Sequence, residues 1–220
     1  ISKGGTIVEG TAGNTGIGLA VVCKEYDLKL KIVIPNTQSV EKKETLKKLG
    51  AELIEVDAVP YANPKNYIKQ SKKIAEDLNK TSSKGVFWAN QFDNIINTEA
   101  HIQTTAEEIW SQTAGSVNGF TCAVGTGGTL AGVSIGLKNK NKNIKIALSD
   151  PMGSSLYSHI KNNKLESSGS SITEGIGTGR ITKNFDKALV DEAFQTDDIE
   201  ALNLVYDLIE KQKIVLGGSS

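Results

Sequence analysis

The sequence predicts an α/β fold, because short apolar strands alternate with helices along most of its 220 residues. Alternation of this kind gives parallel sheets with helices on both faces. Two glycine-rich segments, residues 9–16 and 125–129, each follow a predicted strand and precede a predicted helix. Ligands of parallel sheets bind at the carboxyl ends of strands, so both segments are candidate binding loops.

Residues 1–91 are expected to form a smaller domain in which strands and helices alternate. Pro35 should end the second strand, and Ser39 should cap the next helix, which Gly50 stops. The predicted strands are Thr6–Val8, Leu30–Ile34, Glu52–Val56 and Val86–Ala89. The predicted helices are Ile17–Tyr26, a helix from the Ser39 cap to Leu49, and Asn66–Asn79.

Residues 92–220 are expected to form a larger domain, and the boundary is placed between Gln91 and Ile96. Its predicted strands are Phe120–Val124 and Ile144–Ser149. Its predicted helices are Thr98–Trp110, one that begins at Thr129, a short one near Ser154–Lys161, and Asp198–Gln212.

The composition argues against several classes of function. The chain carries 25 Lys and Arg against 25 Asp and Glu. Domains that bind nucleic acid usually have an excess of basic residues, so no nucleic-acid partner is expected. No apolar run approaches the roughly 20 residues of a membrane span, so no membrane partner is expected. Cys23 and Cys122 are too few for a disulfide framework and are expected to be buried small hydrophobes. This usage fits a reducing compartment, and we expect a cytoplasmic location.

The loop Gly125–Thr129 reads Gly-Thr-Gly-Gly-Thr and is suited to hold an anion. Its glycines let the backbone adopt positive φ and approach a ligand closely. The following helix directs N–H groups and the positive end of its dipole at the loop, and the hydroxyls of Thr126 and Thr129 add donors. A phosphate ester is the usual ligand. The loop has no lysine, which excludes the GxxxxGK[ST] loop of nucleotide hydrolases, and a plain glycine-rich turn is the alternative.

The segment Thr11–Gly16 follows the same logic. Asn14 supplies an amide and Thr11 and Thr15 supply hydroxyls near a helix N-terminus, where they could hold a carboxylate or a ring hydroxyl. Ordinary N-capping is the alternative. Further glycine clusters stand at residues 174–179 and 217–220, which suggests that several loops converge on one ligand.

Together these motifs resemble the cysteine synthase and cystathionine β-synthase family, the fold-type II enzymes that depend on pyridoxal 5'-phosphate. The resemblance is carried by Thr11–Gly16, Gly125–Thr129, Glu174–Gly177 and Gly217–Ser220, in that order. Segments 35–39, 49–53 and 90–92 are also similar to family segments, so the resemblance runs the whole length of the chain. It implies two three-layer αβα domains of the tryptophan synthase β-subunit kind, truncated at both ends.

The resemblance implies a site for pyridoxal 5'-phosphate. In the family the glycine loop holds the phosphate, the asparagine matching Asn14 contacts the ring hydroxyl, and the serine matching Ser219 meets the pyridine nitrogen. A neutral serine leaves that nitrogen largely unprotonated, which suits β-elimination and disfavours transamination. The implied cofactor-binding residues are Asn14, Gly125, Thr126, Gly127, Gly128, Thr129 and Ser219.

The resemblance also implies an amino-acid substrate, whose α-carboxylate is held by the loop after residue 10 with help from Gln91. The implied substrate-binding residues are Thr11, Ala12, Gly13, Thr15, Gln91 and Gly175. Ala12 stands where the family commonly has serine, so this cradle has one hydroxyl fewer. The implied reaction replaces the acetoxy group of O-acetylserine with sulfide and yields cysteine and acetate. The family is usually homodimeric, so a homodimer is expected.

The lysine that forms the Schiff base in this family has no counterpart in the sequence. In the family it belongs to a Ser-x-Lys-Asp-Arg segment well before the asparagine loop, whereas Lys3, the sole lysine before Thr11, lacks matching neighbours. The catalytic residues are therefore unassigned. We expect the chain to be an internal fragment of a longer enzyme and to be inactive alone.

Several alternatives stay open. Cystathionine β-synthase, which joins serine and homocysteine, comes next, because Asp150–Pro151 stands where many cysteine synthases have Glu-Pro. Dehydration of serine or threonine and a non-catalytic protein of the same fold follow. A nucleotide-binding domain would need an acidic residue after the second strand, where residues 35–37 read Pro-Asn-Thr. His101 is expected to make a structural hydrogen bond, and no metal is expected because no ligand spacing fits one.

Overall fold

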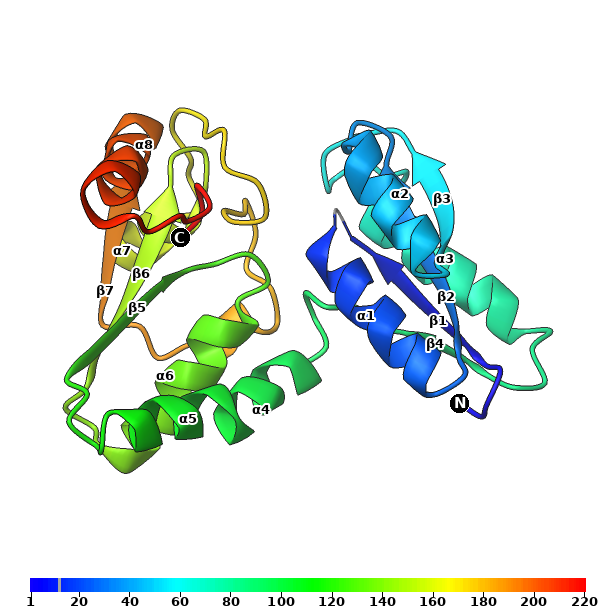
Figure 1. Cartoon of the computed structure of the whole chain (residues 1–220), viewed down its shortest axis with the longest axis horizontal. Helices are drawn as coiled ribbons and strands as arrows, with labels where there is room; N and C mark the ends of the chain where they lie inside the picture. Colours follow the sequence, from blue (N-terminus) through cyan, green and yellow to red (C-terminus); the bar gives the residue numbers. More distant parts are fainter. Residues whose placement is uncertain (12) are drawn as a thin grey trace. The chain divides into compact units, whose positions relative to one another are not determined.

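The computed structural model describes residues 1–11 and 13–220, and Ala12 lies outside the described residues. The chain forms two compact units, Ile1–Gln91 (unit 1) and Phe92–Ser220 (unit 2). Both contain a parallel sheet with helices packed on it (Figure 1). The predicted α/β class is confirmed.

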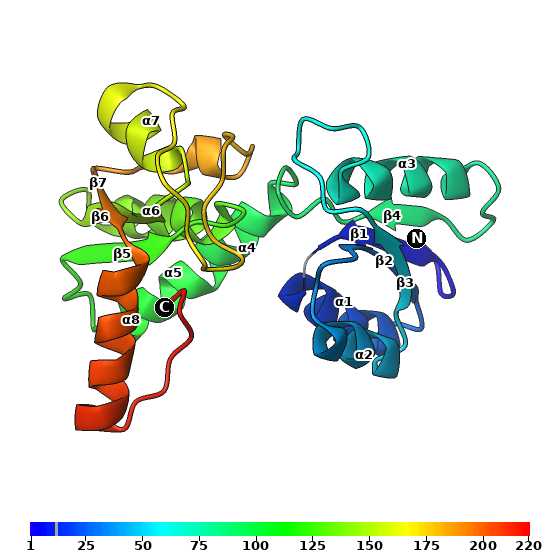
Figure 2. The same ribbon diagram turned by 90° about the horizontal axis from the view of Figure 1, so that it is seen from above.

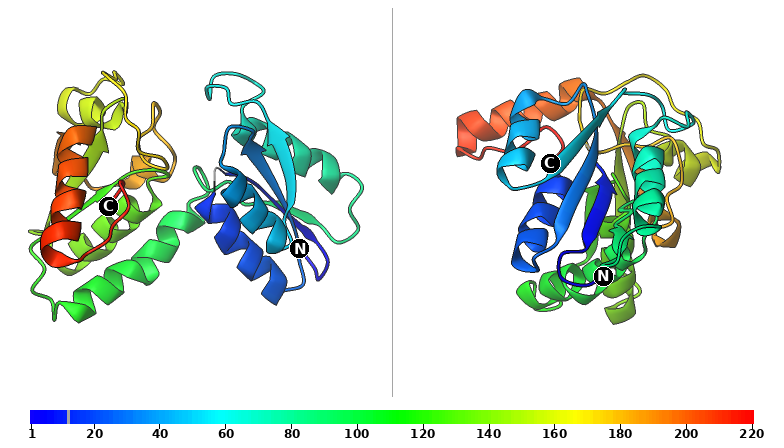
Figure 3. Two further views of the ribbon diagram at one scale, coloured as in Figure 1. Left: turned by 45° about the horizontal axis from the view of Figure 1, so that its top comes forward. Right: turned by 90° about the vertical axis from the view of Figure 1, so that its right-hand side faces the viewer.

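Unit 1 contains a parallel sheet with the strand order β3-β2-β1-β4 (Figures 1 and 3). Its strands are β1 (Thr6–Gly10), β2 (Lys29–Pro35), β3 (Glu52–Val56) and β4 (Val86–Trp88). The two central strands, β1 and β2, carry runs of buried Ile, Val and Leu, as strands covered on both faces require. Successive side chains of a strand point to opposite faces, so Glu9 shares the face of Ile7, which packs with α1 and α2.

Helices cover both faces of this sheet. Figure 2 shows α1 (Asn14–Glu25) and α2 (Val40–Lys48) on one face and α3 (Tyr67–Asn79) on the other. The predicted cap of α2 is confirmed, since Ser39 Oγ accepts a hydrogen bond from the backbone N–H of Lys42 at 3.4 Å. At the start of α3, Asn66 Oδ1 accepts a hydrogen bond from the N–H of Ile68 at 3.1 Å.

The first helix begins earlier than its apolar pattern predicts. The prediction placed its start at Ile17, whereas α1 begins at Asn14. The Gly13 carbonyl accepts hydrogen bonds from the N–H groups of Gly16 (2.9 Å) and Ile17 (3.3 Å), which extends the helix back into the glycine-rich loop. Asn14 and Thr15 therefore lie in the first helical turn.

Unit 2 contains a parallel sheet with the order β5-β6-β7. Its strands are β5 (Gly119–Ala123), β6 (Lys145–Pro151) and β7 (Glu192–Thr196). The prediction missed β7, because this edge strand buries only Ala193 and so lacks a clear apolar pattern. The buried side chains of β6, with those of α6 and α7, form the core of the unit.

The single helix expected over Thr98–Trp110 is two helices that meet at Thr104, and the helix expected over Asp198–Gln212 is α-helical only as far as Asp207. The side chain of Thr104 donates a hydrogen bond to the Ala100 carbonyl at 2.7 Å, and the backbone turns there with φ −118° and ψ −76°. The helices of the unit are α4 (Ile96–Gln103), α5 (Thr105–Gln112), α6 (Gly128–Lys140), α7 (Leu156–Asn162) and α8 (Asp198–Asp207). Short 3₁₀ and π-helical turns follow at Phe185–Lys187 and Leu208–Gln212. Among the residues described, none of the helices is both long and apolar enough to span a membrane.

Helix α6 packs closely on α4 and α5 because glycines stand at positions 132 and 136. A Cβ at Gly132 would lie 2.4 Å from His101 Cβ and 2.5 Å from the Thr98 carbonyl oxygen. A Cβ at Gly136 would lie 2.4 Å from Ala106 Cβ. The backbone of α6 is therefore closer to both helices than any larger residue permits.

We expect Gly136→Ala to lower the free energy of unfolding by about 1–3 kcal/mol, because the added methyl group has no room. Gly18→Ala on α1 is the matched control, since a Cβ there meets nothing within 4 Å. Alanine favours a helix over glycine by about 1 kcal/mol, so this control should be neutral or stabilising. Urea unfolding measures both variants, and equal stabilities would contradict the close packing of α6.

Candidate functional site

The loop Gly125–Thr129 connects β5 to α6 at the carboxyl end of the sheet of unit 2. Gly127 has φ +89°, in the left-handed region, and a Cβ there would lie 2.6 Å from the Phe185 backbone nitrogen. A Cβ at Gly125 would lie 2.3 Å from the Gly175 carbonyl oxygen. Side chains at these two positions are therefore excluded by the segments that pack against the loop.

Hydrogen bonds from both sides fix this loop at Thr126. Thr126 Oγ1 accepts a hydrogen bond from Asn97 Nδ2 at 3.0 Å and another from the N–H of Gly128 at 3.3 Å. The Thr126 carbonyl accepts a third from Thr182 Oγ1 at 2.6 Å. The shape of the loop thus depends on α4 and on the segment that leads to residue 185.

His101 of α4 lies behind the last residue of the loop. Its Nε2 is 3.2 Å from Thr129 Oγ1, and its Nδ1 is 2.9 Å from Thr105 Oγ1. Burial lowers the pKa of His101, which favours the neutral ring. Both contacts are of the structural kind expected for this histidine, and they orient the Thr129 hydroxyl.

The loop has the features of an anion site. It has three glycines, two threonine hydroxyls, and the amino end of α6, a helix of 13 residues. The N–H groups and the dipole at the amino end of a helix attract a phosphate.

The segment after residue 173 lies against this loop. The N–H of Gly177 donates to the Val124 carbonyl at 2.8 Å, in addition to the close approach of Gly175. Farther along, Arg180 binds the Asp93 carboxylate through two hydrogen bonds of 3.0 Å. Burial alone would raise the pKa of Asp93, but the Arg180 hydrogen bond and the Lys183 N–H hold it below its ordinary value. This ion pair ties the segment to the start of unit 2.

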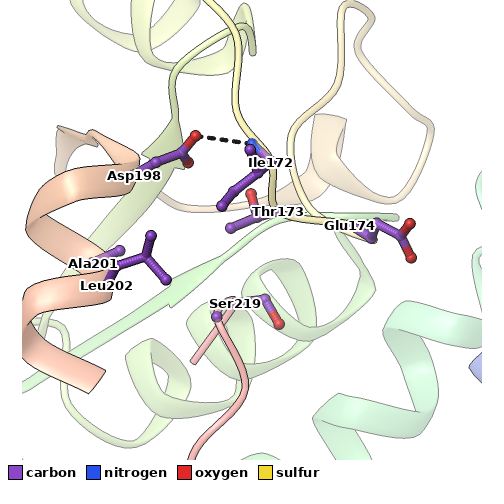
Figure 4. A pocket seen from close by; sticks show the side chains of 8 residues that line it. Ile172, Thr173, Glu174, Asp198, Ala201, Leu202 and Ser219 are labelled. Atoms are coloured by element: carbon purple, nitrogen blue, oxygen red, sulfur yellow. Dashed lines mark hydrogen bonds between the residues drawn. The ribbon is translucent and has the colours of Figure 1, made fainter. Parts of the chain in front are cut away.

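Ser219 lines a cavity of about 230 Å³ at the carboxyl ends of the strands of unit 2. The same cavity is lined by Thr173 and by Ala123, which stands two residues before the glycine loop. An adjoining cavity of about 280 Å³ shares Thr173 and Ser219 (Figure 4), and the Asp198 carboxylate accepts a hydrogen bond from Ile172 N at 2.9 Å beside it. Ser219 and the glycine loop therefore lie at the same edge of the sheet.

The prediction that both cysteines are buried is half right. Cys23 is buried in unit 1, whereas Cys122 is partly exposed because it lines the cavity of Ser219. Burial of the thiol nevertheless raises the pKa of Cys122 to about 11, so the thiol stays protonated near neutral pH. In the part of the chain that the structure describes, no cluster of His, Cys, Asp and Glu is arranged to hold a metal.

The predicted carboxylate loop of unit 1 lies where β1 passes into α1, and Gln91 lies beyond β4, the neighbouring strand. Thr15 Oγ1 donates to Gln91 Oε1 at 2.6 Å, and Gln91 Nε2 donates to the Gly10 carbonyl at 3.3 Å. Thr11 Oγ1 accepts from the N–H of Gly13 at 3.2 Å. The structure thus brings together Thr11, Gly13, Thr15 and Gln91.

Glu9 stands directly beneath this loop and was not predicted to matter. Its carboxylate Oε1 accepts a hydrogen bond from the backbone N–H of Gln91 at 3.3 Å. Burial raises the pKa of Glu9 from 4.5 to about 7, against the opposing effect of the backbone N–H groups of Asn90 and Gln91. A signal was present in the sequence, since a glutamate that directly follows an apolar strand and precedes a glycine loop is unusual.

The predicted site residues therefore form two sets, one within each unit. Unit 2 holds Gly125–Thr129, Gly175 and Ser219, and unit 1 holds the others, with Asn14 exposed in the first turn of α1. Ala12, which was also predicted to bind substrate, lies outside the described residues. That both sets serve one ligand stays a prediction.

Comparison with known proteins identifies similar chains. The family profile described as "Pyridoxal-phosphate dependent enzyme" matches residues 2–220. Cysteine synthase 1 of Neurospora crassa is 50% identical over 225 residues, and cysteine synthase 1 of Emericella nidulans is 47% identical over the same length. Both alignments include the whole of this chain, which spans 58% and 60% of the lengths of these two relatives.

Solved structures show the same similarity. A hydrogen sulfide-producing enzyme of Fusobacterium nucleatum superposes with a TM-score of 0.82 at 35% identity. The superposition covers all of this chain and 70% of the length of that enzyme. A cysteine synthase of Entamoeba histolytica superposes with a TM-score of 0.84 at 34% identity, with coverages of 100% and 61%.

Proposed function

We propose a function from one premise, which is that this chain belongs to the family of pyridoxal-phosphate dependent enzymes. Membership was predicted from the motifs and is confirmed. The whole protein is a cysteine synthase that replaces the acetoxy group of O-acetylserine with sulfide, releasing cysteine and acetate. The names of the relatives from Neurospora crassa and Emericella nidulans support this activity over the other activities considered.

The observation that carries the proposal is the fit of Gly125–Thr129 to a phosphate. Positions 125 and 127 leave no room for a Cβ, and the amino end of α6 faces the loop. Backbone N–H groups of the loop and the hydroxyls of Thr126 and Thr129 hold the phosphate of pyridoxal 5'-phosphate. When bound, the cofactor supplies an electron sink for the α-carbon of the amino acid.

The remaining predicted residues complete the proposal. Asn14 contacts the ring hydroxyl, and Ser219 accompanies the pyridine nitrogen as an uncharged partner. Thr11, Gly13, Thr15 and Gln91 bind the substrate α-carboxylate, and Gly175 lines the substrate side. The protein works as a homodimer in the cytoplasm, and its two unpaired cysteines are consistent with a reducing compartment.

The alternative activity is that of a cystathionine β-synthase, and a direct comparison of the two reactions must distinguish it from cysteine synthesis. Asp150, which pointed to that branch, has a structural contact here, since its Oδ2 accepts a hydrogen bond from the N–H of Tyr157 at 2.7 Å near the start of α7. That contact is independent of the substrate.

We expect the intact enzyme to form cysteine from O-acetylserine and sulfide at least ten times faster than cystathionine from serine and homocysteine. Both products are measured by chromatography after reaction with equal concentrations of the paired substrates. A preference for serine and homocysteine would replace the proposed activity with the alternative. Formation of neither product would remove both.

A further inference from the structure

Glu9 is a buried carboxyl group to which the proposed function gives no role. It is 1% exposed in the central strand β1, and it pairs with no cationic side chain among the described residues. Burial of an unpaired carboxyl group is costly, so its contacts indicate what offsets that cost.

The contacts of Glu9 lie on the turn that follows β4. Its Oε1 accepts a hydrogen bond from the backbone N–H of Gln91 at 3.3 Å. Asn90 has φ +49°, a left-handed conformation that asparagine adopts more readily than most other residues with a side chain, and the backbone turns sharply there. The hydrogen bond from Gln91 to the Glu9 carboxyl holds the residue that follows this turn.

This turn also positions the predicted carboxylate-binding loop of unit 1, which follows β1, and it does so through the Gln91 side chain. Gln91 Oε1 accepts the Thr15 hydroxyl at 2.6 Å, and Gln91 Nε2 donates to the Gly10 carbonyl at 3.3 Å. One connected path therefore runs from Glu9 through the Gln91 backbone and side chain to the first turn of α1. Every member of this path lies within unit 1.

We propose that Glu9 is a positioning residue for substrate binding. Its carboxyl fixes the Asn90–Gln91 turn, so that Gln91 holds Thr15 and the neighbouring backbone ready for the α-carboxylate of the amino acid. This inference rests on the proposed function, because that function assigns the carboxylate to this loop.

The position offers a conservative and a disruptive substitution. Glu9 Oε2 has no hydrogen-bond partner among the described residues, so one accepting oxygen performs the contact. Glu9→Gln keeps that oxygen, whereas Glu9→Met keeps a similar volume and removes it. Should Glu9→Met fail to fold, Glu9→Asp makes the same test, since it withdraws the carboxyl by one methylene.

The test measures kcat/KM of the intact, cofactor-loaded enzyme separately for O-acetylserine and for sulfide. We expect Glu9→Met to lower kcat/KM for O-acetylserine about tenfold, the loss typical of one hydrogen bond. The value for sulfide should change by less than about twofold, because sulfide has no carboxylate. Glu9→Gln should keep both values within about twofold of the wild-type enzyme.

Asn66→Ala is the matched control, because Asn66 is also a buried polar residue of unit 1 and its loss removes a helix cap. It should leave both values of kcat/KM unchanged. The inference is overturned if Glu9→Met leaves the O-acetylserine value intact, if Glu9→Gln is as impaired as Glu9→Met, or if Asn66→Ala shows the same selective loss. An inactive wild-type enzyme would overturn the proposed function first, and this inference with it.

Discussion

Replacement of Gly125 with alanine is expected to weaken the binding of pyridoxal 5'-phosphate by the intact enzyme about 100-fold. The new Cβ would lie 2.3 Å from the Gly175 carbonyl oxygen, so either the loop or the segment at residue 175 must move. Movement of the loop misaligns its N–H groups with the phosphate. Loss of two charge-assisted hydrogen bonds, at roughly 1.5 kcal/mol each, gives this factor.

Equilibrium dialysis of the cofactor against the apoenzyme measures this effect. Gly179→Ala is the matched control, because a Cβ at Gly179 meets nothing within 4 Å and this glycine belongs to the same segment as Gly175. The control should bind the cofactor as tightly as the wild-type enzyme. Unchanged affinity of the Gly125→Ala variant would show that the phosphate does not depend on this loop.

Glu9 should make unit 1 less stable as the pH rises through neutrality. Its pKa is about 7 in the folded state against 4.5 for the free side chain, so between these values the folded state holds the proton that the unfolded state has released. The free energy of unfolding therefore falls across this window, by about 3 kcal/mol in total. Below pH 4.5 Glu9 is protonated in both the folded and the unfolded state, so it no longer makes the free energy of unfolding depend on pH.

Urea unfolding at pH 5 and pH 8 measures this dependence. Unit 1 contains Trp88 and unit 2 contains Trp110, so a Trp110→Phe background lets fluorescence follow unit 1. Between pH 5 and pH 8 the free energy of unfolding of the protein with Glu9 should fall by about 2–3 kcal/mol more than that of the Glu9→Gln variant. Parallel losses in the two proteins would mean that Glu9 titrates as an ordinary glutamate.

The local elements could be predicted from the sequence because their signals are local. Ser39 caps α2 through an N–H only three residues ahead, and the apolar run of β2 lies within a single segment. The edge strand β7 escaped prediction because burial of one alanine leaves no pattern to read. The break at Thr104 escaped because a side chain that bonds back to its own helix leaves the apolar period unchanged.

The supports of the candidate site could not be predicted, because they come from distant parts of the chain. Gly125–Thr129 was recognisable from its five residues, yet Asn97 and Thr182, which fix Thr126, stand 29 and 56 residues away. Asp93 and Arg180 are 87 residues apart. Only the folded chain joins such pairs, and a polar residue in a loop gives no sign of which partner it will meet.

The glycines of α6 have a consequence for attempts to engineer this protein. Gly132 lets α4 approach within reach of the loop, and two residues of α4, Asn97 and His101, contact the threonines there. Thermostabilising campaigns routinely exchange helical glycine for alanine. At Gly132 that exchange would wedge the two helices apart and shift the threonines of the proposed anion-binding loop, so such libraries should leave this position untouched.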